Sequence, residues 1–165
     1  ARTVSAPRPA TSWRRSARAR TLATARPAPD LNTAAHQQVT AEWWESKRKN
    51  FDIRISKVVL KEASAGDTEP AQRRLKLLKP LRLLPITKGS VLLAKALVEG
   101  CALPAKATDD ALHIALAAVH GMHFLLTWNC THINNVATIE EVRAICQQHG
   151  WHCPVICTPD ELIRI

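Results

Sequence analysis

From residue 30 onward, apolar positions recur at helical spacing in some segments and form short continuous runs in others. Helical spacing covers 30–50, 57–66, 68–79, 88–100, 108–121 and 138–150, and a glycine closes most of these segments. Residues 51–56 alternate between apolar and polar side chains as a strand does, and short apolar runs lie at 81–86, 123–128 and 154–158. Fully apolar strands that alternate with helices are typical of a parallel sheet covered on both faces. The sequence therefore predicts an α/β fold with a mostly parallel central sheet.

Length and charge narrow this picture to one domain with a basic extension. The chain has 165 residues, 46% of them hydrophobic, which is enough for one core. Its formal net charge is +9, but residues 1–29 contain seven arginines and no acid, so the remaining 136 residues carry only +2. The basicity therefore belongs to the tail and does not by itself indicate a nucleic-acid-binding domain.

Residues 1–21 are built mainly from Arg, Ala, Pro, Ser and Thr and lack the apolar content of a core segment. Such composition fits an organelle targeting peptide, and it equally fits GC-rich DNA translated out of frame. We expect residues 1–21 to be an aberrant or disordered segment, with the folded domain spanning residues 22–165.

The five cysteines are odd in number and lie in apolar contexts, which favours reduced thiols and a cytoplasmic protein. No run is long enough to span a membrane, so no membrane partner is expected. The cysteines and histidines between residues 130 and 157 lack a paired C-x-x-C spacing, which leaves a zinc site as a minor alternative.

The stretch "TDDALHIALAAVHG" places two carboxylates at the start of a largely apolar helix. Thr108 is a candidate N-cap, and Asp109 and Asp110 in the first turn would favour the helix dipole. Because the helix behind them must be enclosed, an inward carboxylate that forms part of a site is the competing interpretation. His113 lies one turn further on, either as a core histidine or as a residue that orients a ligand.

The segments "VVLKEASAGD", "TDDALHIALAAVHGMHFLLTWNCTHINN" and "VICTPDEL" together resemble the PIN-domain family, in particular its VapC-type toxin ribonucleases. The resemblance implies a PIN-like three-layer domain and a Mg²⁺- or Mn²⁺-dependent ribonuclease that pairs with a cognate antitoxin and often forms a homodimer. By position, Glu62 and Asp110 match the second and third acids of the family and are the expected catalytic and metal-binding residues. Asn129 stands where many members carry a fourth acid and is expected to be a neutral metal ligand.

Phosphodiester hydrolysis needs a hard cation, and clustered carboxylates are its natural ligands. Asp67, Asp109 and His113 are candidates for supporting positions around this site. The basic run at residues 47–49 is either a contact for the RNA backbone or a solvated helix face.

One departure from the family pattern concerns the first acid. The resemblance places it near residues 14–18, at the end of the first, central strand, but no carboxylate precedes Asp30. The first strand is therefore expected to be missing or altered, and the RNA-cleaving activity to be impaired by loss of this ligand. The alternative is a catalytically inactive PIN-like protein that binds an antitoxin or RNA.

Overall fold

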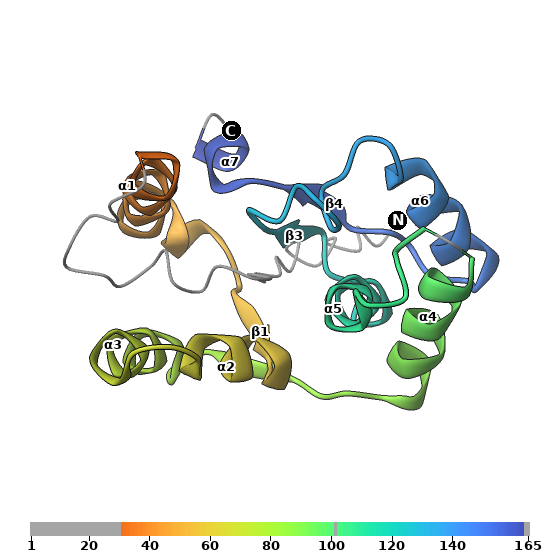
Figure 1. The fold of residues 1–165 in the computed structure, drawn as a ribbon, viewed down its shortest axis with the longest axis horizontal. Helices are drawn as coiled ribbons and strands as arrows, with labels where there is room; N and C mark the ends of the chain where they lie inside the picture. Colours follow the sequence, from red (N-terminus) through yellow and green to blue (C-terminus); the bar gives the residue numbers. More distant parts are fainter. Residues whose placement is uncertain (1–30, 101, 164–165) are drawn as a thin grey trace, which may run out of the picture.

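A computed structural model describes residues 31–100 and 102–163 of the chain (Figure 1). The elements follow the predicted alternation of helices and strands. In chain order they are α1 (Leu31–Ser46), the 3-10 helix η2 (Arg48–Asn50), β1 (Arg54–Ser56), α2 (Lys57–Ser64), α3 (Thr68–Leu78), β2 (Arg82–Leu84), α4 (Lys88–Glu99), α5 (Thr108–Val119), β3 (Phe124–Leu126), α6 (Ile139–Gln148), β4 (Val155–Cys157) and α7 (Pro159–Ile163).

The four strands lie within the four segments that were expected to form strands, and all pair in parallel. β1 pairs with β2, with Ile55 opposite Leu83. β3 pairs with β4, with Leu125 opposite Ile156. Within the described residues the strands form two separate pairs and not one continuous sheet. The α/β class and the parallel strand direction are thus confirmed.

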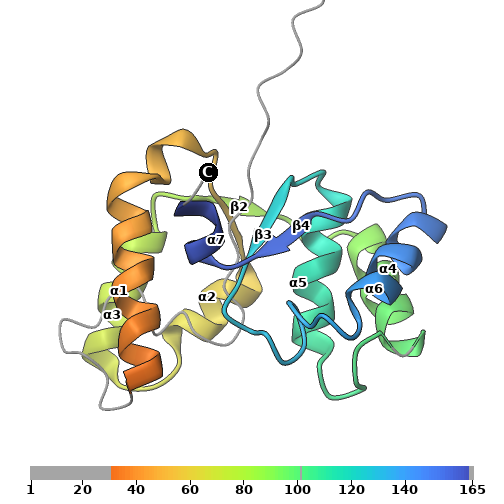
Figure 2. The same ribbon diagram turned by 90° about the horizontal axis from the view of Figure 1, so that it is seen from above.

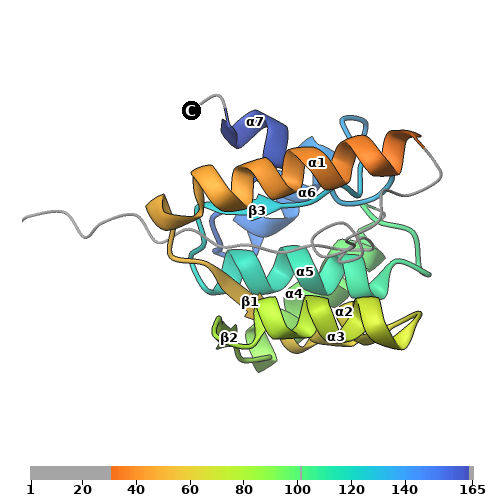
Figure 3. The same ribbon diagram turned by 90° about the vertical axis from the view of Figure 1, so that its left-hand side faces the viewer.

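The β3–β4 pair is covered on both faces, as fully apolar strands require. Leu125 and Ile156 face a core shared with α4, α5 and α6. Leu126 and Cys157, the next residue on each strand, face a second core with Trp43 of α1 and Leu162 of α7. Figure 3 shows α1 on one side of β3 and α5 on the other. This is the helix–sheet–helix layering of the predicted three-layer fold.

The β1–β2 pair is associated with α2 and α3. Ile55, Val59, Ala63 and Leu78 form their common core. Figure 2 shows α1, α2 and α3 grouped on one side of the strands and α4, α5 and α6 on the other. The face of β2 is less enclosed, because Leu83 is 47% exposed.

Helix boundaries follow local chemistry with one difference from the expectation. Gly66 and Gly121 adopt positive φ angles of 89° and 61° where α2 and α5 give way to the next segment, a conformation that favours glycine. The N-cap of α5 is Ala107, so the prediction that Thr108 caps this helix is wrong. A turn in which Ala107 N–H donates to the Pro104 carbonyl makes Thr108 the first helical residue, and its hydroxyl donates to the Ala105 carbonyl.

Three expectations concern the amino end of the chain. The altered first strand, the missing acid near residues 14–18 and the domain boundary after residue 21 all lie outside the described residues. Within residues 31–100 and 102–163, no helix is long and apolar enough to cross a bilayer.

Candidate functional site

Glu62 and His113 meet between two helices that are far apart in the sequence. α2 begins directly after β1, where the Ser56 hydroxyl accepts from Val59 N–H, and Glu62 lies in the last turn of this helix. Its Oε1 lies 3.0 Å from Nε2 of His113 on α5. The His113 side chain is completely buried, and the Glu62 side chain is 19% exposed. The contact therefore fixes a carboxylate at the rim of the core.

Asp110 and Asn129 form the second half of the site. Asp110 lies one turn before His113 on α5, and Asn129 follows the carboxyl end of β3. The Asn129 Nδ2 amide donates to Asp110 Oδ1 at 3.1 Å. Asn129 is itself held on both sides, because its N–H donates to the Thr127 hydroxyl and its Oδ1 accepts from His132 N–H. The structure thus joins Asp110 to Asn129, as it joins Glu62 to His113.

The electrostatics of Asp110 link the two halves. Burial raises the pKa of this carboxyl above its ordinary value, and the negative charge of Glu62 adds to the rise. The charge of His113 and the hydrogen bond from Asn129 act in the opposite direction and lower the pKa of Asp110. Glu62, Asp110, His113 and Asn129 therefore form one interacting group, which we call the acid cluster.

Two buried polar atoms in the acid cluster have no hydrogen-bond partner among the described residues, Glu62 Oε2 and His113 Nδ1. A buried carboxylate oxygen without a partner is costly, and a second carboxylate nearby adds repulsion. A cation would offset both effects. Mg²⁺ is commonly held by one or two carboxylates while it retains several waters, so Glu62 and Asp110 fit such an ion.

The cluster is nevertheless a sparse donor set. Within residues 31–100 and 102–163, no three His, Cys, Asp or Glu side chains are arranged to hold a metal ion. The Asn129 Oδ1 already accepts from His132 N–H, which leaves one lone pair of this neutral oxygen for a cation. The cysteines and histidines considered for zinc do not form such a group either.

The other candidate acids lie outside the cluster. Asp109 is exposed and pairs with Lys61 at 3.2 Å, a contact that joins α5 to α2 beside the Glu62–His113 contact. Asp67 caps the start of α3 through its backbone carbonyl, and its exposed side chain makes no contact with Glu62 or Asp110 in the structure. Asp109 therefore supports the helix pairing, while a supporting role for Asp67 remains a prediction.

Arg74 is a positioning residue that the sequence interpretation missed. It is buried in α3, and its guanidinium donates to the backbone carbonyls of Ala63 and Ala65 at 2.9 and 2.7 Å. These carbonyls directly follow Glu62, so Arg74 fixes the end of α2. The sequence feature that could have identified Arg74 is its position on the apolar face of a predicted helix, between Ala71 and Leu78.

The raised pKa of Asp110 predicts a pH-dependent stability. The folded protein holds the carboxyl proton of Asp110 more tightly than the unfolded chain does. The stabilisation that results is therefore present at acid pH, and it is lost as the pH rises through the raised pKa of Asp110. We expect Asp110→Asn to raise the Tm of the metal-free protein more at about pH 7 than at about pH 4. Thermal unfolding followed by circular dichroism in EDTA measures the difference, and an equal change at both pH values would contradict the assignment.

Comparison with known families agrees with this geometry. Residues 31–129 match the PIN domain family, a segment that covers more than half of the chain and contains the whole acid cluster. No curated protein and no solved structure matches the chain. PIN domains are generally nucleases, and they typically use divalent metal ions. On the strength of the family match, this chain is a member of the PIN domain family.

Proposed function

We propose that this protein is an endoribonuclease that depends on Mg²⁺ or Mn²⁺. The observation that carries the proposal is the convergence of Glu62 and Asp110 from two helices, with the buried Glu62 Oε2 left without a partner. An acid pair of this kind is disfavoured in the metal-free protein and becomes favourable around a cation.

In this mechanism a bound divalent ion would neutralise phosphate oxygens and activate the attacking water. Glu62 and Asp110 would hold the ion. His113, with a proton on Nε2, donates to Glu62 Oε1 and leaves Oε2 free to act as a ligand. Asn129 donates to Asp110 Oδ1 and so orients that carboxylate. These hydrogen bonds fix both acids before the RNA binds.

The proposal predicts RNA cleavage that needs the metal and Glu62. Purified protein should cleave a labelled single-stranded RNA with Mg²⁺ or Mn²⁺ and lose this activity in EDTA. Glu62→Gln should remove most of the activity, because the amide keeps the shape but not the charge. Glu69→Gln is the matched control, since Glu69 is an exposed helix residue paired with Arg73. Cleavage that persists in EDTA, or that Glu62→Gln leaves unchanged, would contradict the proposal.

We further propose that the protein is the toxin half of a toxin–antitoxin pair, working in the cytoplasm. The support is the resemblance of its motifs to the VapC-type group, together with four described cysteines that are all free thiols. A small antitoxin protein should then co-purify with it, and a homodimer is the expected assembly. Expression of the protein alone should stop cell growth, and co-expression of the antitoxin should restore it.

A catalytically inactive binding protein is the second candidate. The observation that favours it is the presence of only two carboxylates in the acid cluster of the described chain. This function predicts co-purification with an antitoxin or RNA and no metal-dependent turnover even at high protein concentration. The cleavage experiment separates the two candidates directly.

A further inference from the structure

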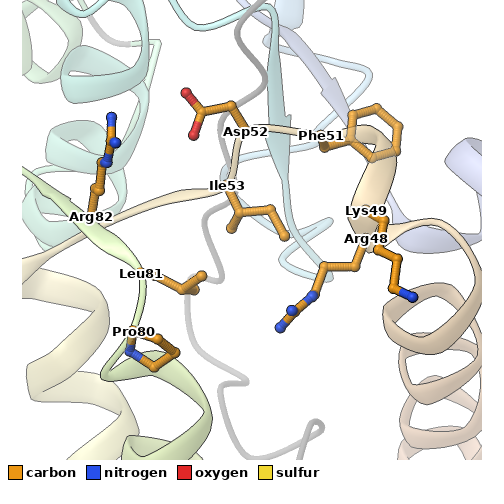
Figure 4. A pocket seen from close by; sticks show the side chains of 8 residues that line it. All are labelled: Arg48, Lys49, Phe51, Asp52, Ile53, Pro80, Leu81 and Arg82. Atoms are coloured by element: carbon orange, nitrogen blue, oxygen red, sulfur yellow. The ribbon is translucent and has the colours of Figure 1, made fainter.

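A pocket of about 440 Å³ opens at the amino ends of β1 and β2. No residue of the acid cluster lines it. Ile53, Pro80 and Leu81 contribute apolar surface to it, and three cationic side chains contribute positive charge (Figure 4). These cations are Arg48, Lys49 and Arg82. We call this site the basic pocket.

The positive charge of the basic pocket is not neutralised within the described protein. Its one acid, Asp52, already pairs with Arg54 through two hydrogen bonds to Oδ2. None of the ion pairs among the described residues involves Arg48, Lys49 or Arg82. The surrounding segment, residues 47–82, contains eleven Lys or Arg and only four Asp or Glu. Three of these eleven basic residues line the pocket, so positive charge exceeds negative charge both in the pocket and in the segment that forms most of it.

The cations flank the apolar surface from two sides. Figure 4 shows Arg48 and Lys49 on the η2 side of the pocket and Arg82 on the β2 side, with Ile53 and Leu81 between them. The Arg48 guanidinium lies 4.9 Å from the centre of the Trp44 ring. This cation–π contact restrains the side chain without neutralising its charge. The pocket therefore offers partly ordered positive charges on either side of a surface that a base or ribose can cover.

We infer that the basic pocket binds the sugar–phosphate backbone of single-stranded RNA at a distance from the cleavage site, an inference that rests on the proposed function. Glu62 and Asp110 repel a polyanion until a cation is bound, so affinity for RNA must come from positive charge elsewhere on the protein. Phosphates contact Arg48, Lys49 and Arg82, and a nucleoside packs on the apolar surface between them.

The test is RNA binding by the full-length protein without cleavage. A short fluorescent oligouridine is titrated in EDTA and followed by fluorescence anisotropy at several salt concentrations. Replacement of the three pocket cations (Arg48→Ala, Lys49→Ala and Arg82→Ala together) should weaken binding about tenfold or more at low salt. The salt dependence should also flatten by about two units, since each phosphate contact to single strands contributes about 0.7.

Two control variants distinguish a site from general electrostatic attraction. Lys88→Ala, Lys95→Ala and Lys106→Ala together remove the same charge from exposed positions outside the pocket and should leave affinity near its original value. A charge-conserving variant (Arg48→Lys, Lys49→Arg and Arg82→Lys) should retain most of the salt dependence. All variants keep residues 1–29, so the arginines of that segment contribute equally to each measurement.

Three results would overturn the inference. The first is unchanged RNA affinity in the pocket variant, and the second is an equal loss in the outside control. The third is loss of a co-purifying acidic protein with RNA affinity intact, which would make the pocket a protein-binding site. Because RNA binding is measured in EDTA, it tests the pocket independently of nuclease activity. If the unsubstituted protein binds RNA but never cleaves it, and the pocket variant loses this binding, the RNA-binding pocket would be supported and the proposed nuclease activity refuted.

Discussion

Asp110→Asn is expected to reduce metal-dependent RNA cleavage by about 10²- to 10³-fold or more, the range found when one preorganised electrostatic group is removed. Asparagine has the same shape and can still accept from Asn129 Nδ2 through its own Oδ1. It removes the negative charge that would hold the cation beside Glu62. The initial rate of cleavage at saturating RNA and varied Mg²⁺ measures the effect.

The neighbouring residue provides a matched control for this loss. Asp109→Asn removes a carboxylate of the same type from the same helical turn, but its side chain is exposed and pairs with Lys61. Exposed ion pairs contribute only about 0–1 kcal/mol, so cleavage should stay close to that of the unsubstituted protein. Equal losses in both variants would show that the first turn of α5, and not the acid cluster, is the sensitive feature.

Trp43→Ala is expected to destabilise the fold by about 3–5 kcal/mol, the usual range for a large aromatic residue removed from a core. Trp43 is 0% exposed and lies in the core between α1, β3, β4 and α7. Its ring packs against Phe51 at a centroid distance of 5.5 Å. The free energy of unfolding measured in urea should therefore fall sharply, and Tm should fall by about 10 °C or more.

Trp44→Ala removes the same side chain one position later and is the control for the Trp43 experiment. Trp44 is only partly buried at the edge of that core, and its ring carries the cation–π contact with Arg48. We expect a loss of about half the Trp43 value or less. A larger loss for Trp44 than for Trp43 would mean that α1 presents a different face to the strands.

The alternation of helices and strands could be predicted because it depends on local patterns. Each apolar run contains a strand, and Gly66 and Gly121 lie where the predicted helices end. Among the described residues the strands form two pairs, and this pairing could not be predicted in the same way. Apolar runs give strand positions but not partners, and partners depend on contacts between residues distant in the sequence.

The candidate site was only partly accessible from the sequence. The apolar helix behind Asp109 and Asp110 made an inward carboxylate an alternative to helix capping, but it did not decide between the two. Glu62, by contrast, resembled an ordinary solvated glutamate beside Lys61, and only the family resemblance singled it out. Its partner His113 lies 51 residues away, a separation at which spacing carries no information about contact. His113 combines the two alternatives, because it is fully buried in the core and also contacts a site acid.

The two strand pairs have a consequence for how the protein acquires its site during folding. Each pair is built from a continuous stretch of chain, 54–84 for β1–β2 and 124–157 for β3–β4, so each can assemble through relatively local contacts. Glu62 belongs to the first stretch, whereas Asn129 belongs to the second and Asp110 to the helix that precedes it. Glu62 and Asn129 come to one site only when these stretches dock, with Ile53 and Leu126 entering the same core. A chain still emerging from the ribosome therefore carries no assembled acid cluster until most of its sequence has been synthesised.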